Sequence, residues 1–233
     1  MKNPVYILAI ASLLLLSYGL YQGMVAAPTE RTMGEVQRIF YYHVPSAWVA
    51  FLLFFVNFIA SIWFLLRRNP RVDALAVATA EVGVVFCTIV LVTGPLWARP
   101  VWGIWWTWDA RLTSTLVLWL IYVSYLVLRQ FGTGGQTPVL ASALAIFGFL
   151  DVPLVYMSIR WFRTQHPQPV IGGGEGSGIH PAMREALMWN FVAFLVFAVL
   201  IVFLRYRLEV AEREVESIHA ERALTPAEAR RNA

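Results

Sequence analysis

The sequence predicts an all-α polytopic membrane protein with six transmembrane helices and a tryptophan-rich segment on its outer face. Hydrophobic residues make up 59% of the 233 residues, and charged residues make up only 14%. Soluble domains contain about 45–50% apolar and about 25% charged residues, so the excess apolar surface must face lipid. This composition excludes a soluble enzyme and a disordered chain. The single cysteine, Cys87, excludes a module held together by internal disulfides.

Six apolar stretches are long enough to cross a bilayer as helices, which takes about 20 residues each. They lack the apolar–polar alternation of membrane barrel strands. The predicted spans are approximately 5–22, 46–66, 74–98, 112–128, 138–160 and 186–204, which form one membrane domain over residues 1–204. Residues 205–233 are predicted to be a charged cytoplasmic tail that continues the sixth helix and ends it near Pro226.

The basic residues predict the orientation, because cytoplasmic loops are enriched in Lys and Arg. With the N-terminus inside, eleven of the 18 basic residues lie on the cytoplasmic side, including those of the tight turn at 67–71. Both termini are then cytoplasmic. The N-terminal stretch also resembles a cleavable signal peptide, and cleavage would leave the later loops where they are. The arginines flank apolar runs instead of forming one basic patch, which excludes nucleic acid as a partner.

Few polar groups interrupt the spans. Glu81 is predicted to pair with a basic residue near the 67–71 turn. Asp151 is expected either to bond to a neighbouring helix as a protonated acid or to line a ligand path, and Pro153 is expected to loosen its helix. Cys87 is expected to be a small buried side chain.

The predicted outer loop at 99–111 reads RPVWGIWWTWDAR and is the most unusual part of the chain. Trp102, Trp105, Trp106 and Asp109 follow helical spacing, so a short helix opened by Pro100 would align them in one stripe. Asp109 is expected to cap the fourth span. One interpretation is an interfacial aromatic belt. The other is a binding surface, which four tryptophans in seven residues favour.

A large flat ring system would stack on such a surface, and arginines at its rim would pair with carboxylates. Neutral histidine would ligate a central metal. Haem requires all three features, and the outer face offers them. Each loop histidine also has an inert interpretation as a hydrogen-bonded surface residue, and the spacing forms no metal motif. No predicted span contains histidine, so a haem site would be shallow and reachable from outside.

At residue level, Trp102–Ser114 (WGIWWTWDARLTS) resembles the WWD signature of haem-handling proteins of cytochrome c maturation. Tyr41–Ala47 (YYHVPSA) resembles the YxHVPxA stretch of the CcmC branch, and Thr164–Pro167 (TQHP) resembles its second histidine motif. The similarity extends from about residue 34 to 204. Gln165 and Pro167 depart from the family pattern, as do His180 and the glycine-rich run 172–178 before it.

The resemblance implies that the WWD segment holds haem b as transient cargo at the periplasmic surface, with His43 and His166 as axial ligands. The candidate haem-contacting residues are Arg99, Trp102, Trp105, Trp106, Trp108, Asp109, Arg111 and Trp161. The implied recipient is the haem chaperone CcmE, which joins haem covalently. The implied assembly contains the ATP-binding cassette pair CcmA and CcmB and the small membrane protein CcmD. Such a protein would promote covalent attachment by positioning, and no nucleophile–base pair of the hydrolase kind stands out.

Two other functions are alternatives to haem transfer. A transporter or channel for haem or another substrate requires a polar path, for which the spans offer little beyond Asn57, Glu81 and Asp151. A structural membrane subunit would use its tryptophans only as anchors.

Overall fold

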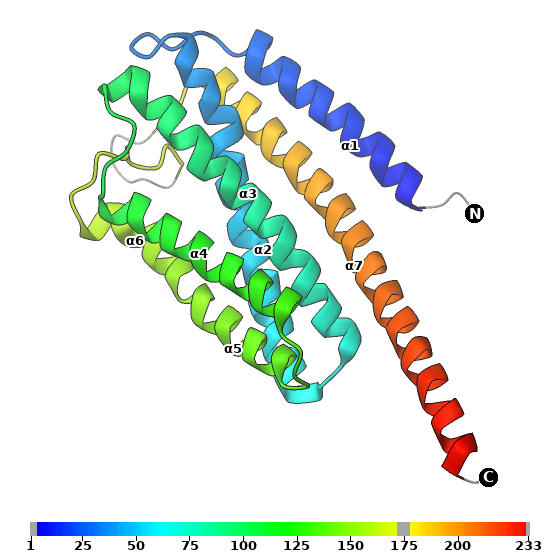
Figure 1. Ribbon diagram of the computed structural model, residues 1–233. Coiled ribbons are helices and arrows are strands. Elements are labelled where there is room, and N and C mark those ends of the chain that lie inside the picture. The colour runs from blue at the N-terminus through cyan, green and yellow to red at the C-terminus, as the bar shows by residue number, and fades with distance from the viewer. Residues whose placement is uncertain (1–3, 172–177, 232–233) are drawn as a thin grey trace.

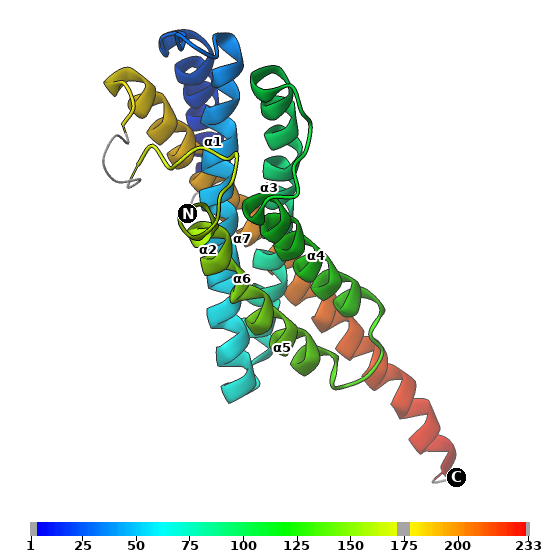
Figure 2. The same cartoon turned by 90° about the vertical axis from the view of Figure 1, so that its left-hand side faces the viewer.

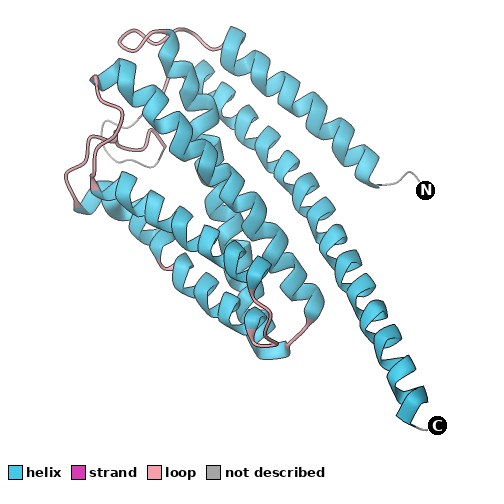
Figure 3. Cartoon of the chain, viewed as in Figure 1, coloured by secondary structure: helices cyan, strands magenta, loops and turns pink. Residues whose placement is uncertain are grey.

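The computed structural model describes residues 4–171 and 178–231, and this part of the chain is almost entirely helical (Figures 1 and 3). The helices are α1 (Pro4–Tyr21), α2 (Phe40–Arg67), α3 (Pro70–Trp102), α4 (Ala110–Phe131), α5 (Thr137–Phe149), α6 (Asp151–Trp161) and α7 (Pro181–Arg231). Two short turns, η1 (Gln22–Ala26) and η2 (Glu35–Ile39), precede α2. Six helical segments are long and apolar enough to span a membrane, with α5 and α6 together forming one of them. The predicted six-span helical membrane fold is confirmed.

The antiparallel pair α2 and α3 forms the centre of the bundle. A tight turn joins them, in which Arg68 adopts the left-handed conformation and Asn69 caps α3 by accepting a hydrogen bond from the Arg71 amide. Helix α7 packs against α1, α2 and α3, whereas α4, α5 and α6 cover the opposite side of the pair (Figures 1 and 2). The charged end of α7 extends past the bundle.

The core contains one close aromatic contact. The rings of Phe54 on α2 and Tyr122 on α4 stack with centroids 3.8 Å apart. Phe54 also covers Gly83 of α3, where an added Cβ would lie 2.7 Å from the ring. Glycine at this position therefore allows α2 and α3 to approach each other closely. Cys87 is 3% exposed in the same core, as predicted.

The predicted fifth span contains a break. Helix α5 ends at Phe149 and α6 begins at Asp151, so that Pro153 lies in the first turn of α6. A proline is tolerated there because the first amides of a helix have no intrahelical acceptor. The predicted span is therefore divided into two helices near Pro153, where loosening was expected. Asp151 Oδ2 is buried and has no hydrogen-bond partner in the described part of the chain.

Helices α2 and α7 differ from their predicted bounds. Helix α2 begins at Phe40, so residues Tyr41 to Pro45, which precede the predicted second span and are expected to lie in a loop, are helical. Its Pro45 lies inside the helix and has no N–H to donate to the Tyr41 carbonyl, so α2 lacks that backbone hydrogen bond. Helix α7 continues through Pro226 to Arg231, and the stop predicted at that proline is wrong. In a charged helix beyond the bundle, water can satisfy the carbonyl that a proline leaves unpaired.

Glu81 pairs with a different element from the one predicted. Its carboxylate accepts two hydrogen bonds from Arg205 of α7, at 2.5 and 2.8 Å, instead of pairing near the 67–71 turn. The partner is 124 residues away along the sequence, so only the packing of α7 on α3 brings the two charges together.

Candidate binding surface at the tryptophan-rich end

One end of the bundle collects the start of α2, the end of α3, the start of α4 and the loop after α6. Helix α3 runs through Pro100 and ends at Trp102, where Gly103 adopts φ 78° and donates its N–H to the Arg99 carbonyl. Residues 104–109 follow without helical structure. The predicted short helix from Pro100 is therefore wrong, because a left-handed glycine C-cap separates Trp102 from the other tryptophans. The four residues of the predicted stripe do not lie on one helical face.

The tryptophans nevertheless form an open surface. Trp102, Trp105 and Trp108 are 39%, 55% and 76% exposed. Trp106 is half-buried and packs edge-on against Trp108, with ring centroids 5.7 Å apart. Its indole Nε1 is buried without a hydrogen-bond partner among the described residues. The Arg99 guanidinium lies 6.0 Å from the centroid of the Trp105 ring.

A shallow hollow joins this segment to the loop after α6. Its walls include Trp102, Trp105, Trp106, Asp109 and His166. Trp161, the last residue of α6, is 60% exposed but does not line the hollow, and neither do Arg99, Trp108 or Arg111. Five of the ten predicted site residues thus line the hollow, whereas His43 and these four residues do not.

His43 and His166 lie next to each other although 122 residues separate them in the sequence. Their ring centroids are 6.5 Å apart, with the ring planes inclined by 33°. His43 is buried on the first turns of α2, and His166 is half-buried in the loop. The pair predicted from the two histidine motifs is thus a pair in space.

Hydrogen bonds fix which nitrogen of each ring carries the proton. Thr93 donates its hydroxyl proton to the Ile89 carbonyl, so its oxygen accepts from Nδ1 of His43 at 2.8 Å. His166 Nδ1 lies 2.9 Å from the Pro167 carbonyl, which can only accept. Both rings are therefore protonated at Nδ1 and carry a lone pair on Nε2, the form that ligates metals.

Burial lowers the pKa of His166 to about 4, and the positive charge of Arg111 contributes to this lowering. Its imidazole is therefore neutral at neutral pH. Arg111 donates a hydrogen bond to the Val155 carbonyl of α6 at 3.2 Å, which fixes the start of α4 against that helix.

Asp109 ties the tryptophan-rich segment to the loop that carries His166. Its Oδ1 accepts from the Leu112 amide at 2.9 Å, which confirms the predicted cap on α4. Its Oδ2 accepts from the Thr107 hydroxyl at 3.2 Å and from the Gln165 amide at 3.3 Å. A single carboxylate thus positions both walls of the hollow.

Sequence reasoning missed two residues next to His43. Thr93 bonds to its ring, and Trp97 packs edge-on against it with centroids 6.0 Å apart. They lie four residues apart on α3 and so face the same way. The four-residue spacing can be read from the sequence, but the sequence does not show that both side chains contact His43 on α2.

His180 lies elsewhere, exposed before α7, where its Nδ1 accepts from the Ala182 amide at 3.3 Å. Residues 172–177 of the glycine-rich run lie outside the described residues.

Comparison with known families identifies the chain. The family model described as CcmC, "Heme exporter protein C", matches residues 1–221. The chain belongs to the CcmC family. This membership confirms the resemblance carried by the WWD segment and the two histidine motifs.

The chain is similar to CcmC-family proteins along most of its length. It is 34% identical over 212 residues to "Heme exporter protein C" of Bradyrhizobium diazoefficiens, covering 91% of this chain and 80% of that protein. It is 36% identical over 210 residues to the protein of the same name from Escherichia coli K12, covering 86% and 81%. A mitochondrial ccmC-like protein of cytochrome c biosynthesis from Marchantia polymorpha is 34% identical over 180 residues, covering 77% and 76%.

Proposed function

We propose that this CcmC-family protein binds haem at its tryptophan-rich end and delivers it for cytochrome c maturation. The observation that carries the proposal is the pairing of His43 with His166. Two imidazoles bound to opposite sides of one iron, each by a bond of about 2 Å, have ring centroids roughly 6 Å apart. The separation in the structure is 6.5 Å, and both Nδ1 atoms are occupied by hydrogen bonds that leave Nε2 free.

The tryptophan-rich segment suits the rest of a porphyrin. Exposed indoles of Trp102 and Trp105 provide apolar faces for stacking, and the half-buried Trp106 supports them. We assign Arg99, beside Trp105, to a haem carboxylate at the rim. We assign the exposed Trp108 and Trp161 to the margin of this surface, and Arg111 to holding α4 against α6.

A shallow site suits transfer more than permanent retention, because an acceptor can reach the cargo from outside the bundle. We propose that the cargo is haem b and that the recipient is the chaperone CcmE, which becomes covalently loaded. CcmA, CcmB and CcmD complete the proposed assembly. In this arrangement the chain lies in an inner membrane, with both termini and the 205–233 tail in the cytoplasm and the tryptophan-rich end in the periplasm. Residues 1–204 form its membrane domain.

The polar groups within the spans favour this function over transport through the bundle. The Asn57 amide donates to the Ala76 carbonyl at 2.7 Å, and Glu81 pairs with Arg205. Asn57 Nδ2 and Glu81 are thus engaged in contacts between helices, whereas Asn57 Oδ1 and Asp151 Oδ2 are buried without a hydrogen-bond partner among the described residues. These two oxygens alone do not form a polar path through the bundle.

The test is the absorption spectrum of protein purified from haem-replete cells, recorded alone and after addition of a soluble domain of the chaperone. We expect His43→Ala and His166→Ala each to weaken or shift the Soret band and to lower covalent loading of the chaperone. His180→Ala is the matched control, because this exposed histidine lies outside the hollow. A wild-type spectrum in the His166→Ala variant, or a larger effect from His180→Ala, contradicts the assignment.

The role of the tryptophan-rich segment is tested separately by replacing both Trp105 and Trp106 with alanine. Loss of haem with both histidines in place is the expected result. Full haem occupancy in this variant would mean that the tryptophans serve only as an interfacial belt.

A further inference from the structure

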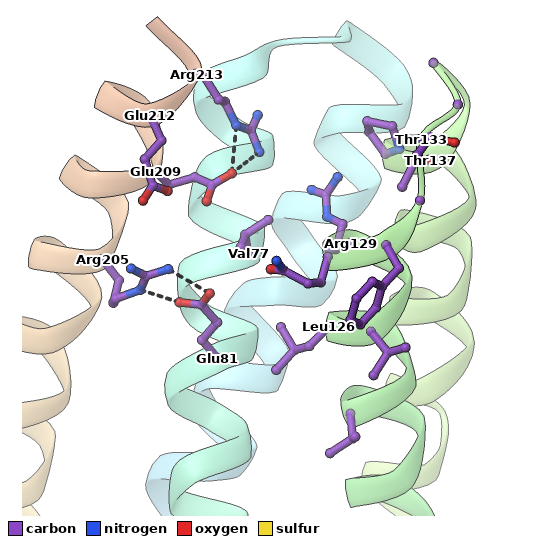
Figure 4. Close-up of a pocket in the computed structure, with 18 residues that line it drawn as sticks. Val77, Glu81, Leu126, Arg129, Thr133, Thr137, Arg205, Glu209, Glu212 and Arg213 are labelled. Atoms are coloured by element: carbon purple, nitrogen blue, oxygen red, sulfur yellow. Dashed lines mark hydrogen bonds and ion pairs between the residues drawn. The ribbon is translucent and has the colours of Figure 1, made fainter. Parts of the chain in front are cut away.

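A second hollow lies at the opposite end of the bundle, between α4 and α7. Helix α3 packs against both helices and forms its floor, and the 132–135 turn closes one side (Figure 4). The groove has a volume of about 740 Å³, within the range of about 300–1,000 Å³ found for small-molecule sites. Neither the histidines nor the tryptophan-rich segment contributes to it.

The groove brings charge to a depth where lipid tails are expected. On the α7 wall, Arg213 lies at the end of the bundle, where it donates to the Pro70 carbonyl at 3.1 Å. Arg205 lies eight residues earlier on the same helix, which places it about 12 Å deeper. Its ion pair with Glu81 leaves the two side chains 33% and 29% exposed. A partly exposed ion pair is costly in hydrocarbon, so we infer that water or a polar ligand group occupies the groove beside it.

The charges around the groove do not balance. Arg129 and Arg213 both pair with the buried Asp73, and Arg213 also pairs with Glu209. Glu81 pairs with Arg205. Three guanidiniums therefore face four carboxylates once Glu212 is included. The surplus charge is that of Glu212, which lies within the field of Arg205 but forms no ion pair in the described part of the chain.

The wall opposite Glu212 offers neutral donors. Thr133 and Thr137 lie across the groove from Glu209 and Glu212 (Figure 4). Their hydroxyls have no hydrogen-bond partner among the described residues, and the Gln130 side chain lines the same wall. A ligand that fits these groups carries a cation for Glu212 and, a few ångströms away, an anion that accepts hydrogen bonds.

The α4 wall adds an apolar requirement. Its deeper lining residues are Val123, Leu126 and Val127, and the polar residues follow toward the turn. The site is thus amphipathic along the membrane normal, with room for an acyl chain below and a headgroup above. We propose that this groove binds a zwitterionic phospholipid with a primary ammonium headgroup, such as phosphatidylethanolamine. Glu212 receives the ammonium, and the 130–137 wall receives the phosphate.

The experiment uses the full-length protein in bicelles containing equal amounts of phosphatidylethanolamine, phosphatidylcholine and phosphatidylglycerol, with bound lipid counted by native mass spectrometry. We expect phosphatidylethanolamine to be retained about tenfold over the other two, because a primary ammonium donates charge-assisted hydrogen bonds to a carboxylate. Choline cannot donate them, and the glycerol headgroup brings no cation. Glu212→Gln abolishes this preference.

Glu214→Gln is the matched control, since Glu214 is exposed on the same helix but does not line the groove. It is expected to keep the lipid preference. Equal retention of the three lipids by the wild type, or equal loss in both variants, overturns the proposal. So does displacement of the lipid by a partner's helix in the purified complex, which would make the groove a protein interface. The haem spectrum of Glu212→Gln is expected to remain that of the wild type, so this test is independent of the proposed haem function.

Discussion

Asp109→Asn separates the two tasks of the carboxylate at the tryptophan-rich end. The side chain receives three donors, namely the Leu112 amide on Oδ1 and the Thr107 hydroxyl and Gln165 amide on Oδ2. Asparagine has one acceptor oxygen. If that oxygen keeps the helix cap, the new NH₂ group faces the Gln165 amide, and the loop carrying His166 loses its anchor.

The size of the effect follows from this one misplaced group. An unsatisfied or opposed donor costs about 1–2 kcal/mol, which corresponds to roughly five- to thirtyfold in an equilibrium constant. We expect Asp109→Asn to bind haem about tenfold more weakly while the α4 cap and the thermal midpoint change little. Asp109→Ala removes the cap as well, and is expected to lose about 1 kcal/mol of stability in addition.

The assay is haem titration followed at the Soret band, with thermal unfolding measured on the same samples. The matched control is Asn69→Ala, which removes a cap of the same kind from α3 at the other end of the bundle. It should lower stability and leave haem affinity unchanged. Wild-type affinity in Asp109→Asn, or an equal loss in Asn69→Ala, refutes the view that Asp109 positions the His166 loop.

Two further substitutions test the packing around the site and the core. Thr93→Val removes the acceptor for His43 Nδ1, so we expect a severalfold loss of haem affinity and a shifted Soret band. Thr93→Ser keeps the hydroxyl and should restore both. An unchanged affinity and spectrum in the valine variant would show that this hydrogen bond does not contribute to haem binding. Gly83→Ala places a Cβ 2.7 Å from Phe54, whereas nothing lies within 4 Å of a Cβ at Gly134. The first is expected to cost about 1–3 kcal/mol in thermal or denaturant unfolding, and similar midpoints for Gly83→Ala and Gly134→Ala would show that α2 and α3 separate without penalty.

Composition and local motifs predict the number of spans and the aromatic, histidine-containing character of the tryptophan-rich end. An apolar run of about 20 residues can hydrogen-bond all its backbone N–H and C=O groups in lipid by forming a helix. Composition and length therefore sufficed to predict the fold class. The Asp109 cap was predictable because N-capping depends on a few neighbouring residues. The candidate ligands His43 and His166 came from local motifs, which name residue types without giving the distance between them.

The tertiary structure alone decided the geometry of the site. The 6.5 Å separation of the two histidines and the contact of Thr93 with His43 depend on how α2, α3 and the loop after α6 pack. Pairing of Glu81 with Arg205 depends likewise on α7 lying against α3. Helical periodicity also misplaced the tryptophans, because a left-handed Gly103 ended α3 within the predicted stripe. Local sequence patterns reflect interactions between residues that are close in the chain. These features instead arise from residues that are distant in sequence and come into contact only when the helices pack.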